Sequence, residues 1–385
     1  MNSIIVKTPV CPVKGDPTMK TRIKFLAIAL IASAATLAVN CGQKASEAAN
    51  TSMMVVYTTG SAFILPEGKS EVPAKVGMVV RQNDVIRTES GTVDLQTRSG
   101  SAVRVREMTR ITISALNASG ETKLNMQHGG LLASVKKAGQ GENFSVVTPT
   151  AIAGVRGTTF SVEVGEDSRS SVRVIDGKVA MAPRVASLDK FSDAQIKADP
   201  NLQKLSDLSK KEIVLEDKTQ GTLDANLEKQ LMNANQVLDS ASPAPAKLTD
   251  VVAATSTAKP VESQKVEVST REIIEARTLV TVDPSIMEKA VKGQESEAAK
   301  EITSRREVAQ ETVLNQIMED AGSVKLNSEK EIQQRYNKLE LVVLKNGDQI
   351  RGAVIAQTEN SIVVHSPEGV KKIPRSDLNY QEPLF

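Results

Sequence analysis

Polar and apolar residues alternate over residues 159–164, where Thr, Ser and Glu take turns with Phe, Val and Val. This period of two is typical of a strand with one buried face. Short runs of the same kind recur between residues 53 and 185, and no helical period of useful length interrupts them. The pattern therefore predicts a domain of short β-strands over residues 53–185.

Three residue pairs that contain glycine predict turns in this β region. Ser99-Gly100 and Asp176-Gly177 each stand between two alternating runs, which is the signature of a hairpin. Gly129-Gly130 stands inside a third apolar stretch and predicts a further turn.

The spacing of apolar residues becomes helical in two later segments, residues 186–239 and 284–335. Their apolar residues recur at helical spacings of three, four or seven positions: Leu202 with Leu205 and Leu223 with Leu227 and Leu231 in the first segment, and Ile302, Ala309, Val313 and Ile317 in the second. Glu301 precedes Arg305 by four residues, a spacing that supports an exposed helix surface. Such thinly apolar helices either wrap the β domain or a partner, or form a solvated spacer, and the sequence favours the spacer.

The segment 240–283 between the helices is rich in Ala, Ser, Thr, Pro and Val, a composition typical of a linker. β signals return in residues 336–385, with an Asn346-Gly347 hairpin and a turn at 366–369. The strands there resemble small SH3-like or Sm-like barrels. The expected fold class is α+β: a mainly β N-terminal domain, a helical and low-complexity middle, and a small barrel-like C-terminal module.

The amino-acid composition bears on how the core packs and on which classes of partner the chain can bind. Aromatic residues make up only 2% of the chain, so the core must rely on β-branched packing. The formal net charge is +2, and residues 1–40 hold five basic residues against one acidic residue, which leaves the remainder slightly acidic. A nearly neutral chain of this kind gives no electrostatic basis for binding nucleic acid.

The N-terminus predicts export. Basic residues after Met19 precede an apolar run over residues 25–39, which is the pattern of a signal peptide and too short to span a bilayer comfortably. The end of the run, with Leu37, Asn40 and Cys41, resembles a bacterial lipobox, and Asn before the cysteine resembles the looser lipoboxes of spirochaetes. An ordinary signal sequence that ends near a buried cysteine is the alternative.

The lipobox resemblance implies several expectations. Residues 1–40 form the signal peptide, with Met19 as the true start, and cleavage falls between Asn40 and Cys41. Lipid, including palmitate, is attached at Cys41, and residues 41–52 form a tether. The resemblance places the protein in the cell outer membrane, on the periplasmic or the surface face.

The β region resembles the FecR domain. The residues that carry the resemblance are Asp84, Ile86, Gly100, Gly130, the run Thr148, Pro149, Val155, Arg156, Gly157 and Thr158, and the closing Asp176-Gly177. The resemblance implies a periplasmic domain, and the best-known members relay a signal from an outer-membrane receptor to a sigma factor. Those members have a cytoplasmic region and a spanning helix at the N-terminus, where this chain has a lipoprotein-type signal.

Arg156 stands among small residues, between Gly154 and Gly157. Its guanidinium could bind backbone carbonyls across a strand corner, or recognise a carboxylate or phosphate. The corner interpretation is favoured, so the run from Thr148 to Thr158 is expected to be structural.

The sequence predicts no catalytic site, no cofactor and no metal site. His128 and His365 are far apart and do not supply a metal set, and common catalytic motifs are absent from the sequence. A carboxylate-based hydrolase is the enzymatic alternative. The favoured function is a non-catalytic lipoprotein that binds or scaffolds other envelope proteins or extracellular ligands. The alternative is a FecR-type signalling component that acts through a partner regulator.

Overall fold

The computed structural model describes the chain from residue 51 onward. The residues that it does not describe are 1–50, 118, 138–142, 241–248, 251, 254, 256–260, 269, 280, 359 and 385. The predicted signal peptide, its cleavage site at Asn40 and the lipidation site at Cys41 lie outside the described residues.

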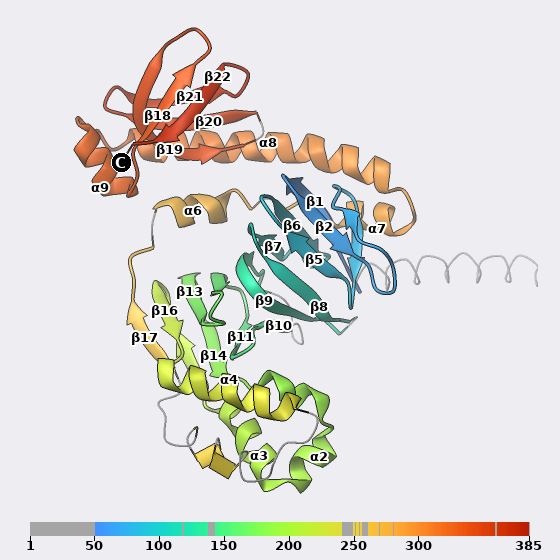
Figure 1. The fold of residues 1–385 in the computed structure, drawn as a ribbon. Coiled ribbons are helices and arrows are strands. Elements are labelled where there is room, and N and C mark those ends of the chain that lie inside the picture. The colour runs from blue at the N-terminus through green and yellow to red at the C-terminus, as the bar shows by residue number, and fades with distance from the viewer. Residues whose placement is uncertain are drawn as a thin grey trace, which may run out of the picture. The chain divides into compact units, whose positions relative to one another are not determined.

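The β region forms two layers of strands (Figure 1). The first layer, sheet A, is antiparallel throughout. Its strands, in spatial order, are β4 (Val79–Arg81), β1 (Ser52–Thr59), β6 (Thr92–Thr97), β7 (Ala102–Val105), β9 (Glu121–Ser134), β12 (Thr159–Val164), β13 (Ser170–Asp176), β16 (Thr219–Thr222) and β17 (Glu262–Lys265).

The second layer, sheet B, shares β9 with the first. It is antiparallel except for the parallel pair of β9 and β10. Its strands, in spatial order, are β3 (Val72–Pro73), β2 (Ala62–Leu65), β5 (Val85–Thr88), β8 (Arg110–Leu116), β9, β10 (Asn143–Val147), β11 (Ala151–Val155), β14 (Val179–Pro183) and β15 (Ile213–Leu215).

Strand β9 corrects the predicted turn at Gly129-Gly130. Its first part pairs with β8 and β10 in sheet B, and from residue 129 it pairs with β7 and β12 in sheet A. The strand bends at this point instead of reversing. Gly129 has φ +96°, and a Cβ there would lie 2.3 Å from the Thr109 Oγ1, so only glycine fits the bend.

The two predicted hairpins have different outcomes. Ser99-Gly100 joins the paired strands β6 and β7, which confirms the first. Asp176-Gly177 joins β13 in sheet A to β14 in sheet B, strands that do not pair with each other, so the second is wrong. Gly177 has φ +97°, and its backbone N–H donates to the Asp217 carboxylate at 2.5 Å. Gly177 therefore lies where the chain crosses from sheet A to sheet B.

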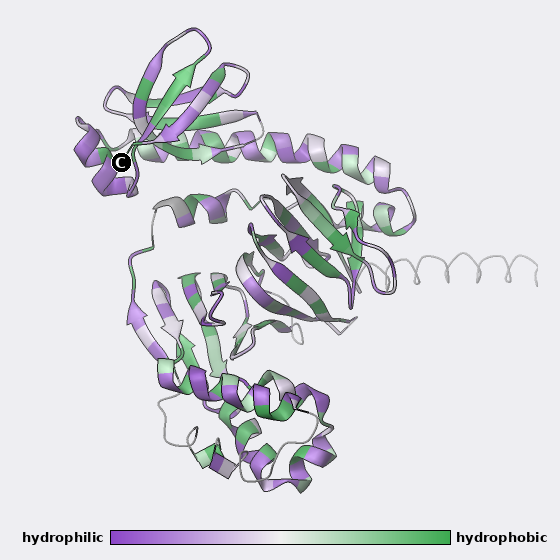
Figure 2. Ribbon diagram, viewed as in Figure 1, coloured by the Kyte–Doolittle hydropathy of each residue, from purple (hydrophilic) through white to green (hydrophobic). Residues whose placement is uncertain are grey.

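The main core lies between the two sheets and is built mostly from Val, Ile, Leu and Met. Phe144 and Phe160 make its aromatic contact, edge to face at 6.4 Å. Along the strands, hydrophobic and hydrophilic residues alternate (Figure 2), which is the pattern that the sequence predicted.

The segment 186–239 packs on this core and is not a solvated spacer. It contains η1 (Ala186–Lys190), α2 (Asp193–Ala198), α3 (Pro200–Asp207), η2 (Leu208–Lys210) and α4 (Ala225–Asp239), and also the strands β15 and β16. Leu202 and Leu205 of α3 and Leu227 and Leu231 of α4 belong to the core cluster of the β sheets. Helix wrapping of the β domain is therefore the alternative that the structure shows.

The next helices are α6 (Thr270–Arg277), α7 (Pro284–Val291), α8 (Glu295–Gly322) and α9 (Glu329–Tyr336). Helix α6 occupies part of the segment that was expected to be a linker. Helix α8 is buried near both ends, through Ala298 and Ile302 in a cluster with β1 and through Leu314 and Ile317 in a cluster with the C-terminal sheet. The expected pair of Glu301 and Arg305 forms at 2.8 Å.

The C-terminal module is a five-stranded antiparallel sheet. Its spatial order is β21 (Gly369–Pro374), β20 (Ser361–Ser366), β19 (Gln349–Gln357), β18 (Glu340–Leu344) and β22 (Leu378–Pro383). The predicted Asn346-Gly347 hairpin and the turn at 366–369 are both confirmed by strand pairing. The α+β fold class is confirmed by the two β regions and the helices between them.

A buried histidine ties α9 to this module. His365 on β20 is 1% exposed, and its Nδ1 lies 2.7 Å from the hydroxyl of Tyr336. Burial, together with the charge of Arg335, lowers the pKa of His365 below its ordinary value of 6.5.

We expect the module to lose stability as the pH falls below about 6.5, because the unfolded chain then binds a proton that the folded His365 resists. Thermal unfolding of the full chain followed by circular dichroism at pH 7.5 and 5.5 measures this. A His365→Phe variant lacks the titrating group and should lose this part of the acid sensitivity. Equal sensitivity in both chains would contradict the assignment to His365.

Candidate functional site

The outer face of sheet A carries a row of polar side chains. Strand alternation buries Leu95, Val103 and Val162 in the core, so their neighbours point to the opposite side. We call this side the arginine face. Its residues are Asp94, Gln96, Arg104, Arg106, Glu163 and Arg173.

At the centre of the arginine face, Asp94 and Arg104 are cross-strand partners on β6 and β7. The guanidinium Nε and Nη2 each donate to a carboxylate oxygen at 2.8 Å, and Asp94 is only 2% exposed. Burial by itself lowers the pKa of Arg104, but the charge and hydrogen bonds of Asp94 outweigh it and raise that pKa. The Arg104 guanidinium therefore stays charged within this buried pair.

Helix α6 lies against this face through carboxylates. The Arg106 Nε and Nη2 donate to Glu275 at 3.0 and 2.9 Å, and the Arg173 Nη1 donates to Glu272 at 2.5 Å. Arg104 also donates to the hydroxyl of Thr278 at 3.1 Å and to its carbonyl at 3.3 Å. A guanidinium beside the end of α6 complements the negative end of the helix dipole.

Beyond α6 the contact with sheet A changes character. The side-chain amide of Gln96 donates to the carbonyl of Val282 and accepts from its N–H, both at 2.7 Å. Helix α7 then packs apolar residues, including Ile286 and Met287, on Met54 and Val56 of β1. The segment α6–α7 is thus held by polar contacts at α6 and by apolar contacts at α7.

The family-like run of residues 148–158 lies elsewhere, from the turn after β10 through the whole of β11 to the residue before β12. Val155 is buried in the core. The hydroxyl of Thr158 donates to the carbonyl of Lys178 at 2.8 Å, and Gly157 has φ +66°. Arg156 is exposed, and its role at a strand corner stays a prediction.

The other end of the run is held from α4. Thr148 and Thr150 hydrogen-bond with the Ser170 hydroxyl at 2.7 and 3.0 Å. The carbonyl of Pro149 accepts from Asn235 at 3.2 Å. Glu228 is 4% exposed and accepts from the Thr150 hydroxyl at 3.1 Å and the Ser170 N–H at 2.8 Å. Nothing in the local sequence around residue 228 distinguishes this buried carboxylate from a surface one.

We expect Glu228→Ala to lower the free energy of unfolding by about 2–3 kcal/mol, since it leaves two buried donors without their acceptor. Glu228→Gln is the matched control, because it keeps an acceptor oxygen. Burial raises the pKa of Glu228. The wild-type chain should therefore lose stability relative to the Gln variant as the pH rises from 4.5 to 7. Urea unfolding at both pH values measures this, and an Ala variant as stable as the Gln variant would contradict it.

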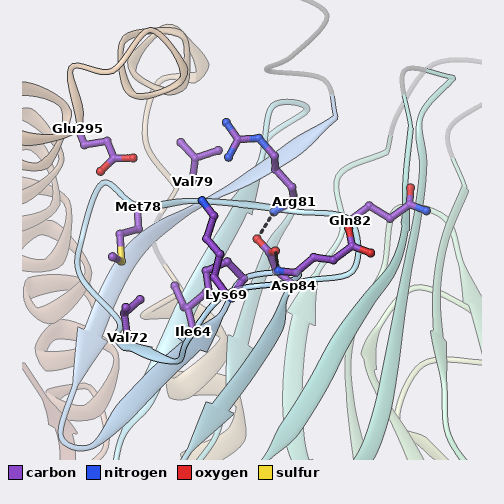
Figure 3. A pocket seen from close by; sticks show the side chains of 11 residues that line it. Ile64, Lys69, Val72, Met78, Val79, Arg81, Gln82, Asp84 and Glu295 are labelled. Carbon is purple, nitrogen blue, oxygen red and sulfur yellow. Dashed lines mark hydrogen bonds between the residues drawn. The ribbon is translucent and has the colours of Figure 1, made fainter.

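A cavity of about 420 Å³ lies beside the edge strands β3 and β4 (Figure 3). Its apolar lining comes from Ile64, Val72, Met78 and Val79, and its charged lining includes Lys69, Arg81 and Glu295. The Asp84 carboxylate accepts from the N–H groups of Arg81 and Glu67 at 2.8 and 2.9 Å. Asp84 therefore holds the local backbone, and the charges around the cavity are of both signs.

The histidines do not meet. His128 is exposed on β9, and His365 is buried on β20. Among the described residues, no three His, Cys, Asp or Glu side chains gather to hold a metal ion. Within the same part of the chain, no helix has both the length and the apolarity needed to cross a membrane.

Comparison with known proteins agrees with the β-domain resemblance. Residues 84–180 match the model of the family described as FecR protein. The match runs from the turn before β5 into β14, so it contains the whole arginine face, whereas β1–β4 and α6 lie outside it. A comparison with curated proteins finds no match.

Two solved structures are also similar. Both are crystal structures of a protein from Parabacteroides distasonis that is provisionally described as an anti-sigma factor, at 14% identity. The first aligns over 50% of this chain and 64% of that chain, with a TM-score of 0.31, and the second over 50% and 62%, with a TM-score of 0.30. This chain therefore spans less than two thirds of the length of those structures.

Proposed function

We propose that this protein is a non-catalytic lipoprotein of the outer membrane, anchored through lipid on Cys41, that binds other envelope proteins through its FecR-like β domain. The observation that carries the proposal is the arginine face. Arg104, Arg106 and Arg173 lie in the part of the chain that matches the FecR family, and they bind a carboxylate-bearing helix from outside it. A domain that holds a helix by directed ion pairs has the chemistry of protein recognition.

A second function, envelope signalling, is favoured by the family match itself. In this version the β domain is the sensing part, and another protein passes the signal to a regulator. A receptor and a sigma factor encoded beside this protein, with target transcription that changes when the protein is deleted, would support the signalling version. Unchanged transcription would support binding or scaffolding alone.

Site-specific photo-cross-linking in intact cells tests the binding function. A photoreactive residue replaces Glu163, whose side chain is 65% exposed on the arginine face, in the full-length lipidated protein. We expect discrete adducts with envelope proteins, identified by mass spectrometry. The matched control is Lys204, an exposed residue on α3, away from sheet A. Equal adducts at both positions, or none at Glu163, would contradict the proposal.

A further inference from the structure

We propose that the arginine face is a docking surface for an acidic helix of a partner protein, and that α6 occupies this surface in cis until the partner displaces it. The inference rests on the proposed binding function and adds the chemistry of the partner. The contacts of α6 define that chemistry, because they show what the surface accepts.

The carboxylate spacing is the first element of recognition. Glu272 and Glu275 are three residues apart, which places both on one side of a helix. They meet Arg173 on β13 and Arg106, which directly follows β7. A partner helix therefore needs two carboxylates at positions i and i+3.

The end of the helix is the second element. Arg104 donates to the side chain and carbonyl of Thr278, directly after α6. Asp94 holds this guanidinium in place by two further hydrogen bonds. A partner helix is thus expected to end about one turn after its second carboxylate, where its last carbonyls meet Arg104.

The contacts of α6 are suited to exchange. The Arg106 and Glu275 side chains are 21% and 23% exposed, and those of Arg173 and Glu272 are 33% and 14% exposed. Water and salt therefore reach both ion pairs and weaken them. A second acidic helix would replace the same ion pairs, so the arginines need not remain unpaired. Helix α7, in contrast, is held by the apolar cluster with β1 and stays attached.

Displacement of α6 would also change its contact with the C-terminal module. Ile274, on the same helix as the two carboxylates, belongs to the apolar cluster that includes Ile355 of β19 and Ile332 of α9. The helix therefore contacts sheet A through its acidic side chains and the C-terminal module through an apolar one. Occupation of the arginine face by a partner would separate these two contacts.

A fluorescent peptide with the sequence of residues 267–279 tests the inference on the purified full chain. We expect the double variant Glu272→Lys/Glu275→Lys, which repels α6 from the arginines, to bind this wild-type peptide at least about tenfold tighter than the unmodified chain does, because the surface is no longer occupied. Glu307→Lys, an exposed change of the same kind on α8, should bind like the unmodified chain.

Charge reversal makes the test specific. Adding Arg106→Glu to the double variant should abolish binding of the wild-type peptide, and a peptide with Arg in place of Glu275 should restore it. No peptide binding to the double variant, with its circular dichroism unchanged, would overturn the inference. Peptide binding that is unchanged by Arg106→Glu would also overturn the inference, because it would show that net charge alone attracts the peptide.

The outcome is separable from that of the proposed function. If cross-linked adducts form at Glu163 in cells but the purified chain does not bind the peptide, the proposed binding function stands and the proposal of an acidic partner helix is rejected. Peptide binding without adducts in cells would keep the docking chemistry and reject the cellular function.

Discussion

The Cys41→Ser protein is expected to incorporate no labelled palmitate and to leave the membrane fraction of the cell. Cys41 follows a basic segment and an apolar run that ends in a lipobox-like sequence, and its sulfur is the atom that would carry the anchor. Each buried acyl CH₂ adds about 0.8 kcal/mol of membrane affinity, so loss of the lipid is expected to remove essentially all of it. Metabolic labelling and detergent phase partitioning measure the two effects.

Cys11 offers the matched control. It is the only other cysteine in the chain, and if synthesis begins at Met19 it is absent from the protein. Cys11→Ser should therefore leave labelling and partitioning unchanged. Palmitate that remains on the Cys41→Ser protein would end the lipoprotein proposal.

Removing one partner of the buried pair on sheet A should give the largest loss of stability. We expect Arg104→Ala to lower the free energy of unfolding by about 3–5 kcal/mol, because it leaves the Asp94 carboxylate buried without its counter-charge. It also removes the hydrogen bonds to Thr278 that hold the end of α6. Urea unfolding of the full chain, followed by circular dichroism, gives the value.

Two further variants separate charge from packing. The double change Asp94→Leu with Arg104→Met removes both charges and should recover most of the loss, since a buried pair replaced by apolar groups is often close to neutral. Arg169→Ala removes an arginine whose pair with Asp167 is largely exposed and should cost less than about 1 kcal/mol. An Arg104→Ala protein as stable as Arg169→Ala would show that the pair on sheet A contributes no stability.

The alternation of polar and apolar residues predicted the strands well, because each strand has one buried face and its apolar residues lie on that face. Strand β12 and the hairpin at Ser99-Gly100 follow from a few neighbouring residues. Assignment of a strand to a layer does not, because the same alternation suits either sheet. The sequence around Gly129 and Gly177 predicts turns within one sheet, whereas in the structure the chain passes from one sheet to the other at both glycines.

The arginine face was missed for a different reason. Arg104, Arg106 and Arg173 look like exposed strand residues, and α6 is short and lies in a segment with linker composition. Only tertiary pairing gives them their role. The spacing of Glu272 and Glu275 was the available signal, but it marks a helix surface without saying what that surface meets.

Strand β9 has a consequence for how the domain unfolds. It is an interior strand of both layers, paired on each side within each of them. Neither layer can separate without breaking the pairing of a strand that the other also needs, so the two layers form a single cooperative unit. We therefore expect the amide hydrogens of β9 to exchange with solvent only through global opening, as the slowest set in the β domain, and at one common rate on both sides of Gly129.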